Sequence, residues 1–170
     1  MKNTGLFLNG VYESVLVEIL AVQTALPEQI MFLQPYKSKA IAQLRDDPPS
    51  VDDPMYLVIS KTKDLPTIHY TAEIVGWDYK RQLPGTERHR VLNRLICTLQ
   101  PNEGGLYNLS QSESGDASVN LLHIRRLRKI SKPFPVSQLT KSEGGSVSDQ
   151  RATSGGWAYI QTAGLGELLG

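Results

Sequence analysis

The segment from Ser118 to Lys141 constrains the fold of this 170-residue chain more than any other part of it. Residues 119–126 alternate with a two-residue period, and one face of the alternation is more apolar than the other, which predicts a β-strand. The chain then crosses a proline-bounded corner and reaches Val136 and Leu139, which are spaced like the first turn of a short helix. A strand that ends in such a corner favours a strongly bent sheet.

The rest of the chain supplies further short strands and a small number of helices. Strands are expected at residues 54–60, 67–77 and 157–160, where apolar, β-branched and aromatic residues gather, and a short strand or a turn is expected at residues 30–35. Within residues 67–77, Gly76 predicts a bulge or a close approach of another part of the chain. Two amphipathic helices are expected at Val11–Leu26 and Thr86–Leu99, so that the chain would begin with a helix.

Few helices, interleaved with short strands, are typical of an α+β protein. We therefore expect a small, strongly bent or closed, mostly antiparallel β-barrel with two main flanking helices. A doubly wound parallel sheet is not expected, because it needs a regular alternation of strands and helices. Residues 1–163 are expected to form one domain, and residues 164–170 a C-terminal tail.

Composition narrows the cellular setting and the chemistry. The single cysteine excludes an intrachain disulfide, and the three histidines are too scattered to predict a zinc site. The sequence shows no signal-peptide pattern and no apolar run long enough to span a bilayer. We therefore expect a cytoplasmic protein without a membrane contact or a cofactor.

The predicted strand after Ser118 is also strongly basic. It carries four cationic side chains and no acidic residue between His123 and Lys132, although the net charge of the whole chain is only +1. Such a stripe suits contact with phosphates, and the candidate phosphate-binding residues are Arg125, Arg126, Arg128 and Lys129. Strand alternation would place Arg126 and Arg128 on one face, opposite Arg125. A solvated strand edge kept soluble by its charges would give the same pattern.

Three segments together resemble the PUA-like superfamily, and within it the EVE and YTH-like branch. These segments are AEIVGWDYKR at residues 72–81, the spaced apolar run from Val119 to Lys141, and VSDQRATS at residues 147–154. The resemblance implies a compact β-barrel whose pocket holds one modified or flipped base between aromatic walls, with basic residues at the rim. It also implies a set of base-binding residues, with Tyr159 as a further wall: Trp77, Trp157, Tyr36, Arg151 and Ser154.

Each of these residues also has a purely structural interpretation. Trp77 ends a predicted core strand and would pack there. Arg151 would satisfy backbone carbonyls at a sheet edge, and Trp157 would fill the end of the barrel.

Catalysis has weaker support in the sequence than binding. His69 and Glu73 would share a strand face but lie about 13 Å apart, too far for one to orient the other. Three functions therefore remain open. The first is a non-catalytic nucleic-acid-binding module, as in phage defence or RNA processing. The second is a protein–protein interaction module or small adaptor subunit, and the third is an unrecognised nucleic-acid-processing enzyme that uses the turn from Ser60 to Asp64.

Overall fold

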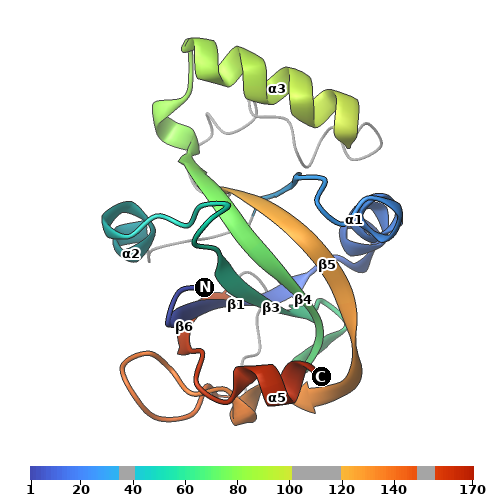
Figure 1. Cartoon of the computed structure of the whole chain (residues 1–170), viewed down its shortest axis with the longest axis vertical. Coiled ribbons are helices and arrows are strands. Elements are labelled where there is room, and N and C mark those ends of the chain that lie inside the picture. Colours follow the sequence, from blue (N-terminus) through green and yellow to red (C-terminus); the bar gives the residue numbers. More distant parts are fainter. Residues whose placement is uncertain (35–40, 101–119, 149–155) are drawn as a thin grey trace.

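The computed structural model describes residues 1–34, 41–100, 120–148 and 156–170, and shows a mixed α+β architecture. Within these residues one six-stranded sheet has the order β2-β5-β4-β3-β1-β6 (Figure 1). Its strands are β1 (Thr4–Val11), β2 (Met31–Leu33), β3 (Met55–Lys61), β4 (Asp64–Tyr79), β5 (Asn120–Pro135) and β6 (Gly156–Gln161). The helices are α1 (Glu13–Ala25), α2 (Ile41–Asp46), α3 (Glu87–Leu99) and α5 (Leu165–Leu169), with 3-10 turns η1 (Lys80–Gln82) and η4 (Val136–Gln138).

The sheet is mostly antiparallel, as expected, since β1 and β3 form the one parallel pair among the described strands. Strands β2 and β6 stand at the two ends of this order and do not pair with each other, so the described strands form an open sheet. The α+β class and the two main helices, α1 and α3, are confirmed. A closed barrel is not formed by the described strands.

The prediction that the chain begins with a helix is wrong, because β1 precedes α1 and lies between β3 and β6. Its residues Leu6, Phe7 and Leu8 are all buried, so this strand has apolar contacts on both faces. Strands covered on both faces lack the apolar–polar alternation that identifies a half-exposed strand.

Two hydrophobic cores lie on opposite faces of the strands. Leu6 and Leu8 of β1 enter the larger core, whereas Phe7 enters the smaller one. The same alternation holds in β3, where Leu57 belongs to the larger core and Val58 to the smaller. The central strands therefore join the two cores into one structure.

Helix α3 lies across one end of β4 and β5, whereas α5 lies near their other end (Figure 1). Thr86 caps α3, because its Oγ1 accepts a hydrogen bond from the backbone N–H of His89. The apolar spacing of this helix predicts that its aliphatic residues all face inward: Val91, Leu92, Leu95, Ile96 and Leu99. Leu92 and Ile96 are buried, but Val91 and Leu95 are 39% and 43% exposed, so the prediction is wrong for these two.

The expected C-terminal tail contains a packed helix. Leu165 and Leu169 of α5 are buried in the smaller core, and the backbone carbonyl of Leu169 accepts a hydrogen bond of 3.1 Å from Nη1 of Arg128. The segment 164–170 has only seven residues, three of them leucines, and this is too short for a helical pattern to be recognised in the sequence. None of the helices in the described residues is long and apolar enough to cross a membrane.

Candidate functional site

The first two arginines of the basic strand are engaged in ion pairs. Arg125 donates from Nε to Glu73 at 2.7 Å and is only 9% exposed. Arg126 donates from Nε to Glu28 at 2.6 Å and from Nη1 to Glu73 at 3.1 Å. Both guanidinium groups therefore already face carboxylates, which a phosphate would have to displace.

The backbone of β5 explains why these two neighbours meet the same glutamate. The pairing of β4 with β5 shifts register between Thr71 and Glu73, and Arg126 has a φ of 55°. The positive φ and the extra residue on β5 are features of a β-bulge, which redirects a side chain. The prediction that Arg126 lies on the face opposite Arg125 is therefore wrong, because both reach Glu73.

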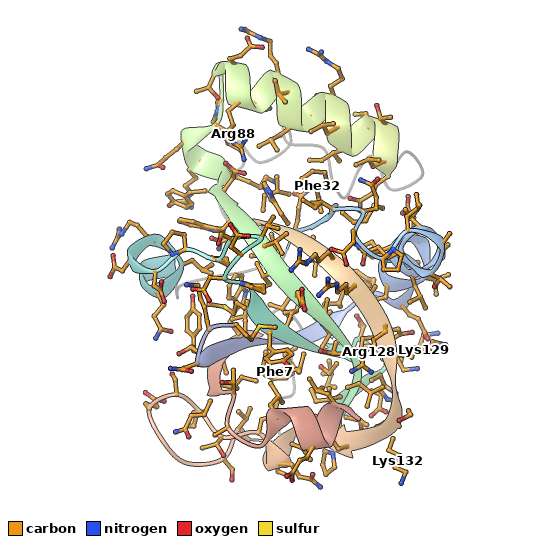
Figure 2. The ribbon with its side chains drawn as sticks, viewed as in Figure 1. Phe7, Phe32, Arg88, Arg128, Lys129 and Lys132 are labelled. Atoms are coloured by element: carbon orange, nitrogen blue, oxygen red, sulfur yellow. The ribbon has the colours of Figure 1, made fainter. Side chains whose placement is uncertain are left out.

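The remaining cations of β5 lie beyond the bulge. Arg128, Lys129 and Lys132 are exposed, and within residues 1–34, 41–100, 120–148 and 156–170 none of them forms an ion pair (Figure 2). The hydrogen bond of Arg128 goes to the neutral carbonyl of Leu169, so its charge is not compensated there. These three side chains are the part of the basic strand that is available to an anionic partner.

The structure does not bring Trp77 and Trp157 together. Trp157 of β6 pairs with Leu8 of β1. Leu8 pairs in turn with Ile59 of β3, and Ile59 pairs with Tyr70 of β4, so Trp157 is in register with Tyr70 across the sheet. Trp77 lies seven residues further along β4, which corresponds to roughly 23 Å of strand. These two indoles therefore do not form opposite walls of one base-sized slot.

Each tryptophan has its own surroundings. Trp77 stacks on Tyr79 with ring centroids 6.4 Å apart, and its Nε1 donates to Oδ1 of Asn120. Trp157 and Tyr159 are half-buried against the larger core, and burial raises the pKa of the Tyr159 phenol. The other predicted base-binding residues, Tyr36, Arg151 and Ser154, lie outside the described residues.

A cluster of charged groups that sequence reasoning did not assemble lies beneath α3. Asp78 of β4 receives a hydrogen bond from the Nε and another from the Nη2 of Arg88, both at 2.8 Å, and His123 Nε2 lies 2.7 Å from its Oδ2. Burial alone would raise the pKa of Asp78, but the hydrogen bonds and charges of His123 and Arg88 outweigh it and lower the pKa to about 2. The cluster joins β4, β5 and α3.

The position of the His123 ring depends on Gly76. A Cβ atom at Gly76 would lie 2.8 Å from Nδ1 of His123, and the pairing of β4 with β5 shifts register between Ile74 and Gly76. The predicted bulge or close approach at Gly76 is thus confirmed. On the other side, Phe32 meets the imidazole edge to face, with ring centroids 5.1 Å apart and planes at 77°. Gly76 was therefore the sequence signal that could have located this cluster.

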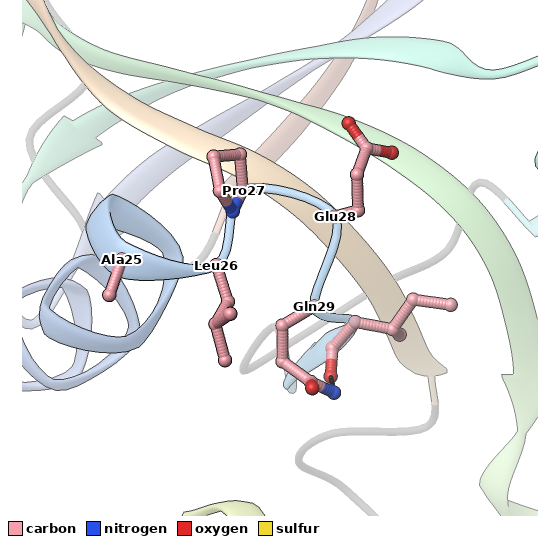
Figure 3. Close-up of a pocket in the computed structure, with 6 residues that line it drawn as sticks. Ala25, Leu26, Pro27, Glu28 and Gln29 are labelled. Carbon is pink, nitrogen blue, oxygen red and sulfur yellow. Dashed lines mark hydrogen bonds between the residues drawn. The ribbon is translucent and has the colours of Figure 1, made fainter.

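An apolar hollow of about 240 Å³ adjoins the cluster. It is lined by Gln29, Ile30, Phe32, Arg88, Val91, Leu92, Leu95, Leu99 and His123. A second hollow of about 550 Å³ is lined by residues 25–30, so the two share Gln29 and Ile30 (Figure 3). The two hollows adjoin at these shared residues, between the end of α1 and α3, and are together called here the α1–α3 groove. The lining is mostly apolar, with Glu28, Gln29, Arg88 and His123 as its polar residues, and such a lining suits an apolar group.

The turn from Ser60 to Asp64 is held by hydrogen bonds to neighbouring segments. Ser60 Oγ accepts from the backbone N–H of Gly10 at 3.0 Å and donates to Oδ1 of Asn9 at 3.2 Å. The carboxylate of Asp64 lies 2.7 Å from Nε2 of His69, so its hydrogen-bond partner is this imidazole and not the Ser60 hydroxyl. The described residues also hold no cluster of three or more side chains suited to a metal ion.

Comparison with family models, with curated proteins and with solved structures finds no match for this chain.

Proposed function

We propose that this protein is a non-catalytic nucleic-acid-binding module that contacts the phosphate backbone through the outer part of β5. The observation that carries this proposal is the difference between the two halves of the basic strand. Arg125 and Arg126 are paired with glutamates, whereas Arg128, Lys129 and Lys132 are exposed and carry charges that no described carboxylate compensates. Cations of this kind bind phosphates by releasing condensed counterions.

The finer form of the proposal is a PUA-like reader of a modified or flipped base. It rests on the resemblance of residues 72–81, 119–141 and 147–154 to that superfamily. Because Trp77 and Trp157 are far apart, the reader would use one of them with Arg151 and Ser154, and Trp157 is nearer to these two in the chain. Cation binding to phosphates would supply affinity, and stacking on one indole would supply preference for the base.

A salt series of binding measurements tests the backbone contact. Fluorescence anisotropy with labelled single-stranded and duplex DNA and RNA compares the wild type with the triple variant Arg128→Ala, Lys129→Ala and Lys132→Ala. Loss of three phosphate contacts should reduce the slope of log K against log salt by about 2 to 3. The matched control removes three exposed cations elsewhere, with Lys63→Ala, Arg90→Ala and Arg94→Ala, and should keep the wild-type slope.

Two results would reject this proposal. One is a wild type that binds none of the four nucleic acids at low salt. The other is a triple variant whose affinity and salt slope equal those of the control.

The α1–α3 groove supports a second candidate, a protein–protein interaction module. Leu26, Val91 and Leu95 line it and are 58%, 39% and 43% exposed. Exposed aliphatic side chains grouped along one groove are typical of surfaces that receive an apolar segment of a partner. A double variant, Val91→Ser and Leu95→Ser, should reduce the fluorescence of bound 1-anilinonaphthalene-8-sulfonate. Unchanged dye binding would show that the groove is not an accessible apolar surface.

A further inference from the structure

Lys80 carries a buried positive charge that the described part of the chain does not compensate. It is the first residue of η1, directly after β4, and is 2% exposed. Its Nζ donates a hydrogen bond to the Oε1 of Gln34, a neutral acceptor. No carboxylate among the described residues pairs with it, and burial lowers the pKa of Lys80 to about 8. Buried ammonium groups are normally paired, because desolvation disfavours the charge.

Gln34, the partner of Lys80, has an unsatisfied group of its own. An ammonium group only donates hydrogen bonds, so it must face the carboxamide oxygen, and this fixes the orientation of the Gln34 side chain. The Nε2 group of Gln34 is then left buried and without an acceptor, on a residue that is 7% exposed. A buried amide donor without a partner is costly. Lys80 and Gln34 thus place two kinds of donor side by side: Nζ has a neutral acceptor but no counter-charge among the described residues, and Nε2 has no acceptor.

The two residues meet at one end of the sheet. Gln34 directly follows β2, Lys80 directly follows β4, and β5 begins between these strands at Asn120, which pairs with Tyr79. Asn120 repeats the pattern, because its Oδ1 accepts from Trp77 while its Nδ2 is buried and unpaired. This end of the sheet is therefore rich in donors. It lies at the opposite end of the β4–β5 ladder from Lys132, so it is separate from the proposed nucleic-acid surface.

We propose that Lys80 and Gln34 form a binding site for an oxyanion, a phosphate or carboxylate group whose oxygens accept hydrogen bonds from Nζ and Nε2. An oxyanion meets both requirements of the site at once. It supplies the negative counter-charge that is missing beside the buried ammonium, and it offers acceptors without adding another donor. Because Nε2 and Oε1 share one carbon atom, the unpaired amide donor lies next to the ammonium, so one bound anion would contact both donors.

Thermal unfolding in phosphate or in acetate, at constant ionic strength, tests the site and distinguishes a phosphate ligand from a carboxylate ligand. The bound anion should raise the midpoint temperature of the wild type by about 5–10 °C when it is present at about 100 times its dissociation constant. Lys80→Gln removes the charge but keeps an N–H donor for Gln34, and should lose this response. Lys63→Gln, at an exposed lysine, is the matched control for the general effect of the salt and should keep it.

A second variant supplies the missing charge from within the chain. Gln34→Glu places a carboxylate beside the ammonium, so it should stabilise the protein without added anion and abolish the response to phosphate and acetate. If another carboxylate of the chain already neutralised Lys80, Gln34→Glu would instead destabilise the protein by repulsion between like charges. That result would overturn the proposal.

Nuclear magnetic resonance of the Lys80 side chain gives a readout that does not depend on a variant that folds. The titration of its ε-methylene signals reports the pKa of the amine, which a bound anion should raise towards the ordinary value. A pKa of Lys80 that is unchanged by both phosphate and acetate would overturn the proposal. Equal midpoint shifts in the wild type and Lys80→Gln would do so as well.

Discussion

Asp78 connects the charge cluster beneath α3 to the stability of the fold. Its pKa is lowered from 3.8 to about 2, so the folded form binds the proton less readily than the unfolded form. For such an acid the stabilisation is fully present above about pH 4 and is lost as the pH falls through 2. A shift of this size corresponds to about 2 kcal/mol of unfolding free energy.

Replacing Asp78 by Asn should therefore lower stability at pH 7 and flatten its dependence on pH below 4. Urea unfolding of both proteins between pH 2 and pH 7 measures this. Parallel curves for the wild type and Asp78→Asn over that range would contradict the linkage between this carboxyl and its partners His123 and Arg88.

Gly76 offers a steric test of the same region. In Gly76→Ala the added Cβ would lie 2.8 Å from the His123 ring, and since the imidazole is held between Phe32 and Asp78, it cannot move freely. We expect a loss of about 1–3 kcal/mol in the free energy of unfolding. Gly166→Ala is the matched control, because nothing lies within 4 Å of its added Cβ and its backbone is helical. A control that loses as much stability as Gly76→Ala would rule out the steric explanation.

At the scale of elements, α5 shows how a short segment acquires structure from its contacts. Five residues are too few for a helix that is stable alone, so α5 depends on the burial of Leu165 and Leu169. Leu169→Ala should cost about 2–5 kcal/mol of unfolding free energy, as for other buried leucines.

Leu168, which is half-buried, provides the comparison within the same helix, and Leu168→Ala should cost less. Chemical denaturation of the two variants decides between a packed helix and a tail. Two variants as stable as the wild type would show that the helix does not support the core.

At the scale of the whole molecule, the central strands should make unfolding a single event. Adjacent residues of β3, such as Leu57 and Val58, enter different cores, so one core cannot open while the strand stays in place for the other. Leu57→Ala and Val58→Ala should each lower the midpoint of one common transition. Far-ultraviolet circular dichroism and tryptophan fluorescence, recorded on the same samples, should coincide. Separate transitions for the two signals would contradict the prediction.

Local patterns in the sequence were sufficient for much of the fold. The period of the apolar residues predicts the helices α1 and α3, since each has an exposed and a buried side. The β-branched and aromatic residues at 67–77 predict β4, and the alternation after Ser118 predicts β5. Gly76 likewise predicts the close approach that His123 makes. Strand β1 was not predicted, because its apolar residues Leu6, Phe7 and Leu8 are buried on both faces and therefore show no apolar–polar alternation.

The candidate sites were decided by the tertiary structure. The sequence by itself determined that β5 is basic, but the partners of its charges come from distant positions, such as Glu73 and Glu28 for Arg126. In the same way, Lys80 and Gln34 are 46 positions apart and meet only because β2 and β4 both flank β5. Whether a charge is free, neutralised or buried depends on contacts between such segments, which a local pattern does not encode.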